Sequence, residues 1–397
     1  MEDPPSWPYW FSPVERLPAA LRADLGRLLA RLGSPFLPLV EANLWAGAPG
    51  VSSPLHFDAA HNVYAQLRGR KRFVLFPADV SDDLYVFPRL HPSTRQSRLD
   101  LRALPPAGFG RFHRRRAACT EGGGVRGGGA LHAREVVLTP GDVLYIPPYV
   151  WHRVATLADD APAVSVSVLT QSTAIVAYPL LKAHPLPFPP DWSRAQRLAA
   201  LGEYVLALAA LPPPLAGATT ADAADASFAC AVGGRCACAV DAHEAALADG
   251  GCTESRRCAA AAAAAGGRRG AAAAAALGAA AVRTLLASRF DGVGDEAPPL
   301  VSGLSAALAV ARDALAAELR WQPPPPLPPA AAARLRAHAR ALRAKVEQLP
   351  LRGAPLSAAV WAQEAASLIE DVVSATLSAR EAEAFLRWLV GDPPFWV

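Results

Sequence analysis

Short apolar runs separated by turn residues form the pattern of residues 36–170. The runs that predict strands are 39–45, 55–58, 62–68, 73–76, 135–138, 143–146 and 163–169. Turn sequences such as Thr139-Pro140-Gly141-Asp142 divide them. Many short strands between turns are typical of an all-β barrel or jelly roll, so the expected fold class is a mainly β core.

Helical periodicity flanks this β region on both sides. Upstream, Ser12 and Glu15 form a capping pattern and leucines recur at helical spacing, which predicts a helix over 12–33. Downstream, the expected helices are 193–211, 304–321, 330–349, 356–376 and 379–390. The apolar face of the last helix contains Phe385, Trp388 and Leu389, and it could be core or a dimer surface.

These patterns divide the chain into five regions. A helical segment, 1–35, precedes the β region, 36–170, and 107–134 is expected to be a flexible Arg- and Gly-rich surface insert within it. A helical extension, 171–211, is followed by an Ala/Gly-rich low-complexity insert, 212–300, and by a C-terminal helical region, 301–397. The first part of the Ala/Gly-rich insert, 212–282, is expected to be largely disordered.

Composition narrows the classes of protein. The net charge is +4 and the pI about 8.8, too mild a basic balance to indicate nucleic-acid binding. The sequence shows neither a membrane span nor a secretory signal, so we expect a soluble protein of the cytoplasm or nucleus. Five of the six cysteines lie within 230–258, together with His243. Their irregular spacing suits a poorly ordered, thiol-bearing insert better than a structural zinc site, and both remain open.

The strongest chemical signal is the pair His56 and Asp58. Residues i and i+2 of a strand point to the same face, so both side chains can reach one point in space. A third ligand, His152, follows the apolar run Val143 to Ile146 and the pair Pro147-Pro148. Two histidines and one carboxylate form the facial triad that holds Fe(II) in non-haem oxygenases. Taken singly, each residue could instead be a core histidine, a turn aspartate or a surface histidine.

Iron in such a site needs electrons to activate O2, and a 2-oxoacid cosubstrate supplies them. A dicarboxylic cosubstrate also needs a cation inside the barrel for its remote carboxylate. Lys71 begins an apolar strand and shares its face with Phe73 and Leu75, so it is the candidate. Asn62 would share the face of Asp58 and could hydrogen-bond the chelating carboxylate. Ser53 and Tyr9 could add hydroxyl donors.

At this point the sequence resembles a known family. The segments Ser53 to Asp58, Gly69 to Pro77 and Gly141 to His152 are similar to the cupin-like JmjC hydroxylases. Together with 91–97, they resemble above all the asparaginyl hydroxylase that inhibits hypoxia-inducible factor. The resemblance covers about residues 36–170.

The resemblance implies a fold, a site and an activity. The fold would be a double-stranded β-helix that binds Fe(II) through His56, Asp58 and His152. Lys71, helped by Ser53, would bind 2-oxoglutarate, and Asn62 would lie near its chelating carboxylate. The activity would be that of a dioxygenase that uses O2 to hydroxylate a side chain of a protein or peptide substrate. C-terminal helices would form a homodimer.

The chain also departs from that hydroxylase. Ser167 stands where a second asparagine is expected on the last barrel strand, Leu169 replaces a tryptophan, and Ala60 replaces a glutamine that contacts peptide substrate. Asparagine as the target is therefore in doubt. The early tyrosine-bearing strand is represented at best by Tyr9-Trp10-Phe11.

Several alternatives remain open on sequence grounds. A lysyl or arginyl hydroxylase, a JmjC demethylase and an RNA-base hydroxylase would share the same platform. A non-catalytic cupin binding module would share the fold alone, and a truncated product would fail to fold. Retention of all three ligands and of Lys71 favours an enzyme, and the absence of recognisable reader modules favours a hydroxylase over a demethylase.

Overall fold

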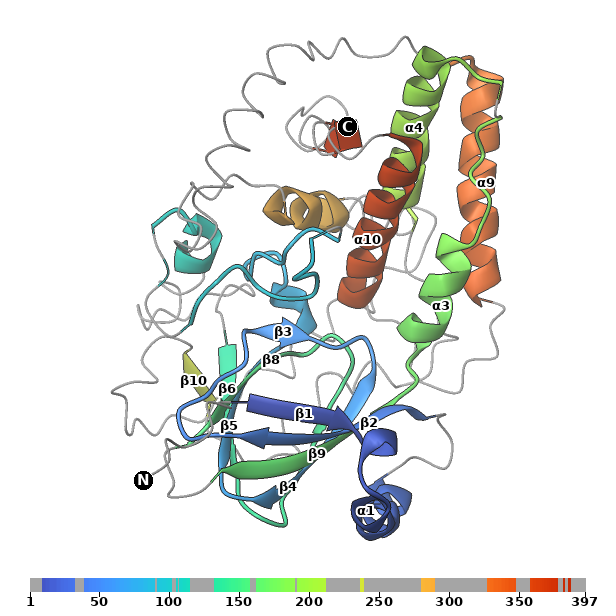
Figure 1. Ribbon diagram of the computed structural model, residues 1–397. Helices are drawn as coiled ribbons and strands as arrows, with labels where there is room; N and C mark the ends of the chain where they lie inside the picture. Colours follow the sequence, from blue (N-terminus) through green and yellow to red (C-terminus); the bar gives the residue numbers. More distant parts are fainter. Residues whose placement is uncertain are drawn as a thin grey trace, which may run out of the picture.

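The computed structural model contains a β core beneath a layer of helices (Figure 1). It describes residues 9–32, 39–89, 91–101, 105, 107–114, 132–157, 162–189, 191–211, 236–238, 280–289, 327–347, 358–377, 381–382 and 385–386. The core is a jelly roll of two antiparallel sheets, with strand orders β1-β2-β9-β4-β7 and β10-β6-β5-β8-β3. The mainly β core followed by a helical region agrees with the fold class expected from the sequence.

The strand boundaries follow the apolar runs closely. The first sheet contains β1 (Tyr9–Pro13), β2 (Leu39–Gly47), β9 (Ala163–Thr170), β4 (His61–Arg68) and β7 (Val143–Ile146). The second contains β10 (Cys236–Cys238), β6 (His132–Leu138), β5 (Lys71–Phe76), β8 (Trp151–Thr156) and β3 (His56–Phe57). Strand β8 lay outside the predicted strands, because its sequence WHRVAT lacks a clean alternation of apolar and polar residues.

The alternating burial along β5 shows which of its faces points into the jelly roll. Lys71, Phe73 and Leu75 are buried on one face of the strand, whereas Arg72 on the other face is half-buried and pairs with Glu135 at 3.4 Å. Phe73 and Leu75 pack with Tyr64 and Leu144 from the opposite sheet. A lysine therefore lies within an otherwise apolar core layer.

The N-terminal helix is shorter than predicted. Helix α1 spans Ala19–Leu32, and the residues before it form β1 and a 3-10 turn. The expected cap is not made, because the Ser12 hydroxyl donates to the Pro13 carbonyl at 3.0 Å. Residues 9–13 gain backbone hydrogen bonds by pairing with β2, and the helix begins only after Pro18. The prediction of a helix over 12–33 is therefore wrong at its start.

After the jelly roll, four longer helices of the described part of the chain share one apolar core. They are α3 (Thr173–Lys182), α4 (Arg194–Ala209), α9 (Pro329–Glu347) and α10 (Ala358–Thr376). The predictions 193–211, 330–349 and 356–376 match three of them within two residues. Ser193 and Gln196 form a capping box that fixes the start of α4. Phe385 is buried in the same core, which decides between the two roles left open for that residue.

Helix α10 is also tied to the jelly roll. The Ser81 hydroxyl accepts hydrogen bonds from Gln363 Nε2 of α10 at 2.6 Å and from the Trp151 indole of β8 at 2.8 Å. Trp151 precedes His152 and is fully buried. The helical layer thus buttresses the strand that bears one of the candidate ligands.

Two expected inserts contain ordered elements. Within 107–134, Phe109 and Phe112 are buried, and Arg111 Nη1 donates to the Thr284 carbonyl at 3.0 Å. Within 212–300, residues 280–289 are helical, and Val282, Leu285 and Leu286 join the helical core. The composition around these segments gave little sign of their few large apolar residues. The expected flexibility of 107–134 is therefore wrong for 107–114, and the expected disorder of 212–282 is wrong for its last residues, 280–282.

Several predictions lie outside the described residues. Helix 304–321 and most of helix 379–390 belong to this group, as do Cys119, Cys230, Cys252, Cys258 and His243. Cys236 and Cys238 lie in β10, which pairs with β6. None of the described helices is long and apolar enough to cross a membrane.

Gly69 closes the turn between β4 and β5, and we predict that its replacement by alanine destabilises the protein. Its φ is +64°, and an added Cβ would lie 2.9 Å from Ala163 Cα. Left-handed backbone costs an L-residue about 1–2 kcal/mol before any clash. We expect Gly69→Ala to lower the free energy of unfolding by at least about 2 kcal/mol, measured by urea denaturation.

The matched control is Gly26→Ala in α1. Gly26 has no heavy atom within 4 Å of an added Cβ, and alanine favours the helix. This variant should be as stable as the native protein or more so. Equal stability changes in the two variants would contradict the role assigned to Gly69.

Candidate metal centre

Three candidate ligands come from two neighbouring strands. His56 lies on β3 and pairs directly with His152 on β8, and Asp58 follows the end of β3. Antiparallel pairing places both imidazoles on the same face of the sheet, with ring centroids 4.2 Å apart. His152 is 3 % exposed, whereas His56 and Asp58 are half-buried.

One ligand atom from each residue converges on a common space. The three atoms lie within 4.8 Å of one another, and His152 Nε2 is 3.7 Å from Asp58 Oδ2. Ligands at about 2.0–2.2 Å from a metal can be separated by no more than roughly 4.4 Å, so a small inward movement of the outer atoms completes the coordination. Among the described residues this is the one cluster of three or more metal-ligating side chains.

Backbone carbonyls fix the tautomer of both histidines. His56 Nδ1 lies 2.9 Å from the Pro54 carbonyl, and His152 Nδ1 lies 3.0 Å from the Val150 carbonyl. A carbonyl oxygen can only accept, so each Nδ1 carries the proton and each Nε2 presents a lone pair. Such outer hydrogen bonds orient metal-binding histidines and raise their basicity.

Electrostatics keeps His152 neutral. Burial lowers its pKa, and the nearby His56 lowers it further, while Asp58 opposes both. A neutral imidazole is the form that binds a metal. Asn62 Nδ2 donates to Asp58 Oδ2 at 3.4 Å, a long hydrogen bond that still holds the amide beside the carboxylate.

Lys71 forms a second polar centre inside the jelly roll. It is 1 % exposed, and its Nζ donates to Tyr64 OH and to Ser165 Oγ, each at 2.8 Å. These two bonds leave one N–H of the ammonium group, and none of the described carboxylates pairs with it. Burial lowers the pKa of Lys71 to about 8. A buried cation with a spare donor is suited to bind a carboxylate.

Tyr64 and Ser165 are the residues that sequence reasoning missed. Tyr64 is two positions after Asn62, and Ser165 is two positions before Ser167, so strand alternation places each on the interior face with its neighbour. That signal was available in the sequence. Ser167 instead accepts a hydrogen bond from the Trp45 indole at 2.8 Å.

Ser53 and Tyr9 are not among the hydrogen-bond partners of Lys71 within the part of the chain that the structure describes. The Ser53 hydroxyl accepts from the Val154 N–H of β8 at 3.0 Å. The Tyr9 ring packs 5.7 Å from that of Trp45. Burial raises the pKa of Tyr9 itself to about 12, which keeps the phenol a hydrogen-bond donor.

Orphaned polar atoms lie on the strands that line the interior of the jelly roll. Asn43 Oδ1, Asn62 Oδ1 and Gln66 Oε1 are buried without a hydrogen-bond partner, and all three residues lie on the interior strands β2 and β4. Buried polar atoms are costly when unpaired. The set of two imidazoles and a carboxylate fits Fe(II), and Lys71 with its hydroxyl neighbours fits the remote carboxylate of 2-oxoglutarate.

Comparison with known proteins bears on the same region. Residues 20–170 match the cupin-like domain family. This stretch is similar to the cupin-like JmjC domains of other proteins. The matched residues include all three candidate ligands and Lys71.

Three relatives illustrate the likeness. Jumonji C domain-containing protein 5 of Drosophila melanogaster is 33% identical over 132 residues, 32% of this chain and 27% of the relative. Lysine-specific demethylase JMJ30 of Arabidopsis thaliana is 30% identical over 119 residues, 30% and 24% of the two chains. The tRNA wybutosine-synthesizing protein 4 of Neurospora crassa is 32% identical over 159 residues, 39% and 12%.

The matches are confined to the domain. They span about a quarter or less of these relatives' own lengths. The likeness is therefore limited to this region, and the whole protein's activity, substrates and partners are matters for proposal.

Proposed function

We propose that the protein is an Fe(II)- and 2-oxoglutarate-dependent dioxygenase that hydroxylates a side chain of a protein or peptide. The observation that carries the proposal is the convergence of His56, Asp58 and His152 within 4.8 Å, with the buried Lys71 on a neighbouring strand of the same sheet. A metal triad together with an unpaired buried cation is the arrangement that an iron-chelating dicarboxylate requires.

Each residue has a defined task in this proposal. His56, Asp58 and His152 would hold Fe(II) on one side and leave the opposite positions for cosubstrate and O2. Lys71, with Tyr64 and Ser165, would anchor the far carboxylate of 2-oxoglutarate and so orient its oxoacid end. Asn62 would hold Asp58 in place. The bound iron supplies the redox chemistry: O2, 2-oxoglutarate and a substrate C–H become succinate, CO2 and a hydroxyl group.

The test is turnover of 2-oxoglutarate by the full chain. We expect succinate to form only when Fe(II), 2-oxoglutarate and O2 are all present, measured by mass spectrometry of the reaction mixture. A cell extract supplies substrate, and captured proteins are searched for new +16 Da modifications. A correctly folded protein that binds metal but releases no succinate under any of these conditions would contradict the proposal.

The reaction product distinguishes a protein hydroxylase from the alternative enzymes. A demethylase would release formaldehyde, and an RNA-base hydroxylase would modify reacted RNA rather than peptides. One relative is named a demethylase and another a tRNA-modifying protein, so the assay should test both formaldehyde release and RNA modification. A non-catalytic binding module would need neither an intact triad nor the buried Lys71.

The proposal of side-chain hydroxylation rests on the sequence resemblance to the asparaginyl hydroxylase, and it does not extend to asparagine as the target. Ser167, which stands at the position of the second expected asparagine, is occupied by the Trp45 indole. Ala60 is buried and carries no polar group to contact a peptide. Recognition of the target residue therefore differs from that in the hydroxylase.

A further inference from the structure

A cavity of about 280 Å³ lies between the jelly roll and the helical layer. None of the three candidate metal ligands lines it, and neither does Lys71. Phe57, which does, lies between His56 and Asp58 and by strand alternation points to the opposite face. The cavity thus lies across this segment from the metal centre and adjoins it, since the Tyr149 N–H donates to the Asp58 carbonyl at 2.7 Å. Its volume is just below the range of about 300–1,000 Å³ for small-molecule sites.

One wall of the cavity is apolar and flat. Phe57 and Tyr149 stack with ring centroids 5.0 Å apart, and Val86, Phe87 and Ile175 extend this surface. An aromatic or short apolar body can pack against such a wall.

The other wall carries ionisable side chains whose hydrogen-bonding capacity is only partly used. Arg89 Nε donates to Tyr178 OH at 3.2 Å, but its terminal nitrogens make no hydrogen bond within the described residues. The Arg95 side chain, which is exposed, has no hydrogen bond or ion pair there either. Glu364 is 5 % exposed, and its Oε2 is buried without a partner. Arg89, Arg95 and Glu364 all line this cavity, and no hydrogen bond links their side chains to one another. A ligand in the cavity could therefore bond to all three.

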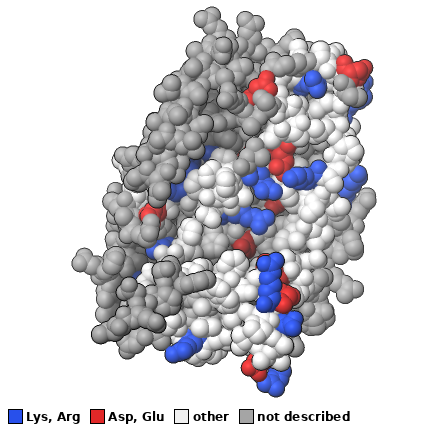
Figure 2. Space-filling model, viewed as in Figure 1, with Lys and Arg blue, Asp and Glu red and all other residues white. Residues whose placement is uncertain are grey.

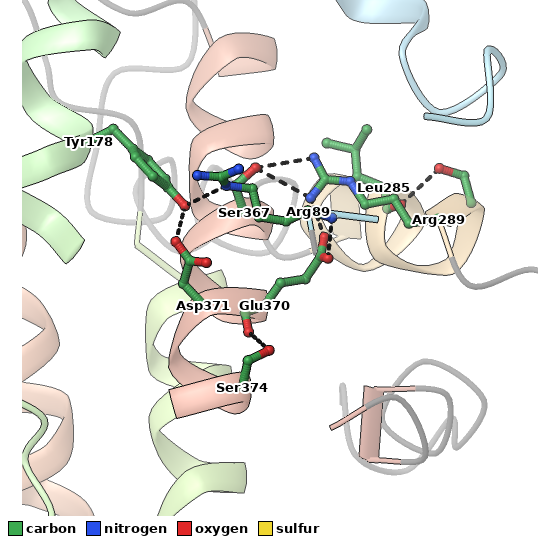
Figure 3. A network of polar contacts seen from close by, with 9 residues as sticks. Arg89, Tyr178, Leu285, Arg289, Ser367, Glu370, Asp371 and Ser374 are labelled. Atoms are coloured by element: carbon green, nitrogen blue, oxygen red, sulfur yellow. Dashed lines mark hydrogen bonds and ion pairs between the residues drawn. The ribbon is translucent and has the colours of Figure 1, made fainter. Parts of the chain in front are cut away.

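The acidic residues beside the cavity are already engaged (Figure 3). Glu370 of α10 pairs with Arg289 and accepts the Arg89 backbone N–H at 2.6 Å. Asp371 accepts the Tyr178 hydroxyl and lies 3.7 Å from Lys182. Figure 2 shows basic and acidic side chains gathered between the jelly roll and the helices. With these carboxylates paired elsewhere, Arg89 and Arg95 give the cavity an excess of positive charge.

We propose that this cavity is a second ligand site, which binds a small carboxylate with a flat apolar body. Arg89 and Arg95 donate to the carboxylate, Glu364 shares a proton with it, and the ring packs on Phe57 and Tyr149. Arginine pairs with carboxylates through its planar fork of donors. The described residues that line it include none of the proposed Fe(II) and 2-oxoglutarate ligands.

The state of Glu364 supports an anionic ligand. Burial raises the pKa of its carboxyl to about 8, an effect that Arg95 and Arg89 reduce and Asp371 reinforces. At pH 7 the carboxyl is therefore mostly protonated and can donate to the ligand. Above pH 8 it becomes an anion and repels one.

Isothermal titration of the full chain with benzoate tests the site. We expect saturable binding at pH 7, at least about tenfold tighter than binding of the neutral benzamide, and no binding of benzylamine. Arg95→Gln should weaken benzoate binding by at least about tenfold. Arg340→Gln, which removes an exposed arginine on α9, is the matched control and should leave binding unchanged.

Two further variants test where benzoate binds and what Glu364 does. Lys71→Met should bind benzoate as the native protein does, whereas Glu364→Gln should keep binding at pH 7 and lose the decline above pH 8. Benzoate binding that is lost in Lys71→Met and kept in Arg95→Gln would place the ligand in the jelly roll and overturn the proposal. Preferential binding of benzylamine, or no saturable binding of benzoate, would overturn it as well.

Discussion

Replacing His56 with alanine will lower succinate formation from 2-oxoglutarate by more than about 100-fold, because the proposed iron site would lose one of its three protein ligands. The remaining pair, Asp58 and His152, lies 3.7 Å apart but cannot supply the third donor. The half-buried position of His56 also makes global unfolding of the variant less of a concern than for His152, which is buried.

Metal binding gives a second readout of the same variant. Mn(II) with 2-oxoglutarate should raise the melting temperature of the native protein, since a ligand at 100 times its Kd stabilises the folded state by about 2.7 kcal/mol. The rise should vanish in His56→Ala. His61→Ala is the matched control, because His61 contacts Tyr145 OH at 2.7 Å and belongs to no cluster of ligands. Full turnover by the His56→Ala variant would show that His56 is not a metal ligand.

Replacing Lys71 with methionine will raise the KM for 2-oxoglutarate by at least about 30-fold. Methionine keeps most of the apolar stem and removes the ammonium group, which is 1 % exposed and bonded to Tyr64 and Ser165. Loss of one partner from a buried charge pair costs about 2–5 kcal/mol, and each 1.4 kcal/mol is a factor of ten. Succinate release over a range of cosubstrate concentrations measures the change.

The matched control is Arg72→Met on the outer face of β5. Arg72 is half-buried, pairs with Glu135 and points away from the interior, so its loss should change the KM by less than about twofold. Equal effects of the two variants would show that net charge, rather than a carboxylate contact inside the barrel, controls cosubstrate affinity.

The pH dependence follows from the same lysine. Burial lowers the pKa of Lys71 to about 8, so the ammonium form is present below that pH and is lost above it. The KM of the native protein for 2-oxoglutarate should therefore rise as the pH increases from 7 to 9. Lys71→Met has no such group, and its KM should lack this rise.

The sequence determined the strand pattern and the identity of the candidate ligands. Apolar runs of four to eight residues gave most strands, because period-2 alternation is a local property of the chain. The spacing of His56 and Asp58 already placed them on one face. The alternation of Lys71 with Phe73 and Leu75 likewise indicated an inward lysine, and all three are buried.

Only the tertiary structure decided how distant segments meet. The direct pairing of His56 with His152, the bonds of Lys71 to Tyr64 and Ser165, and the contacts of Trp151 with α10 through Ser81 depend on register between strands and helices far apart in the chain. The start of α1 after β1 and the burial of Phe112 were likewise decided by nonlocal pairing and packing, which override local propensity. Local pattern specifies which face a side chain occupies, whereas its partner across the core is fixed by the arrangement of the whole fold.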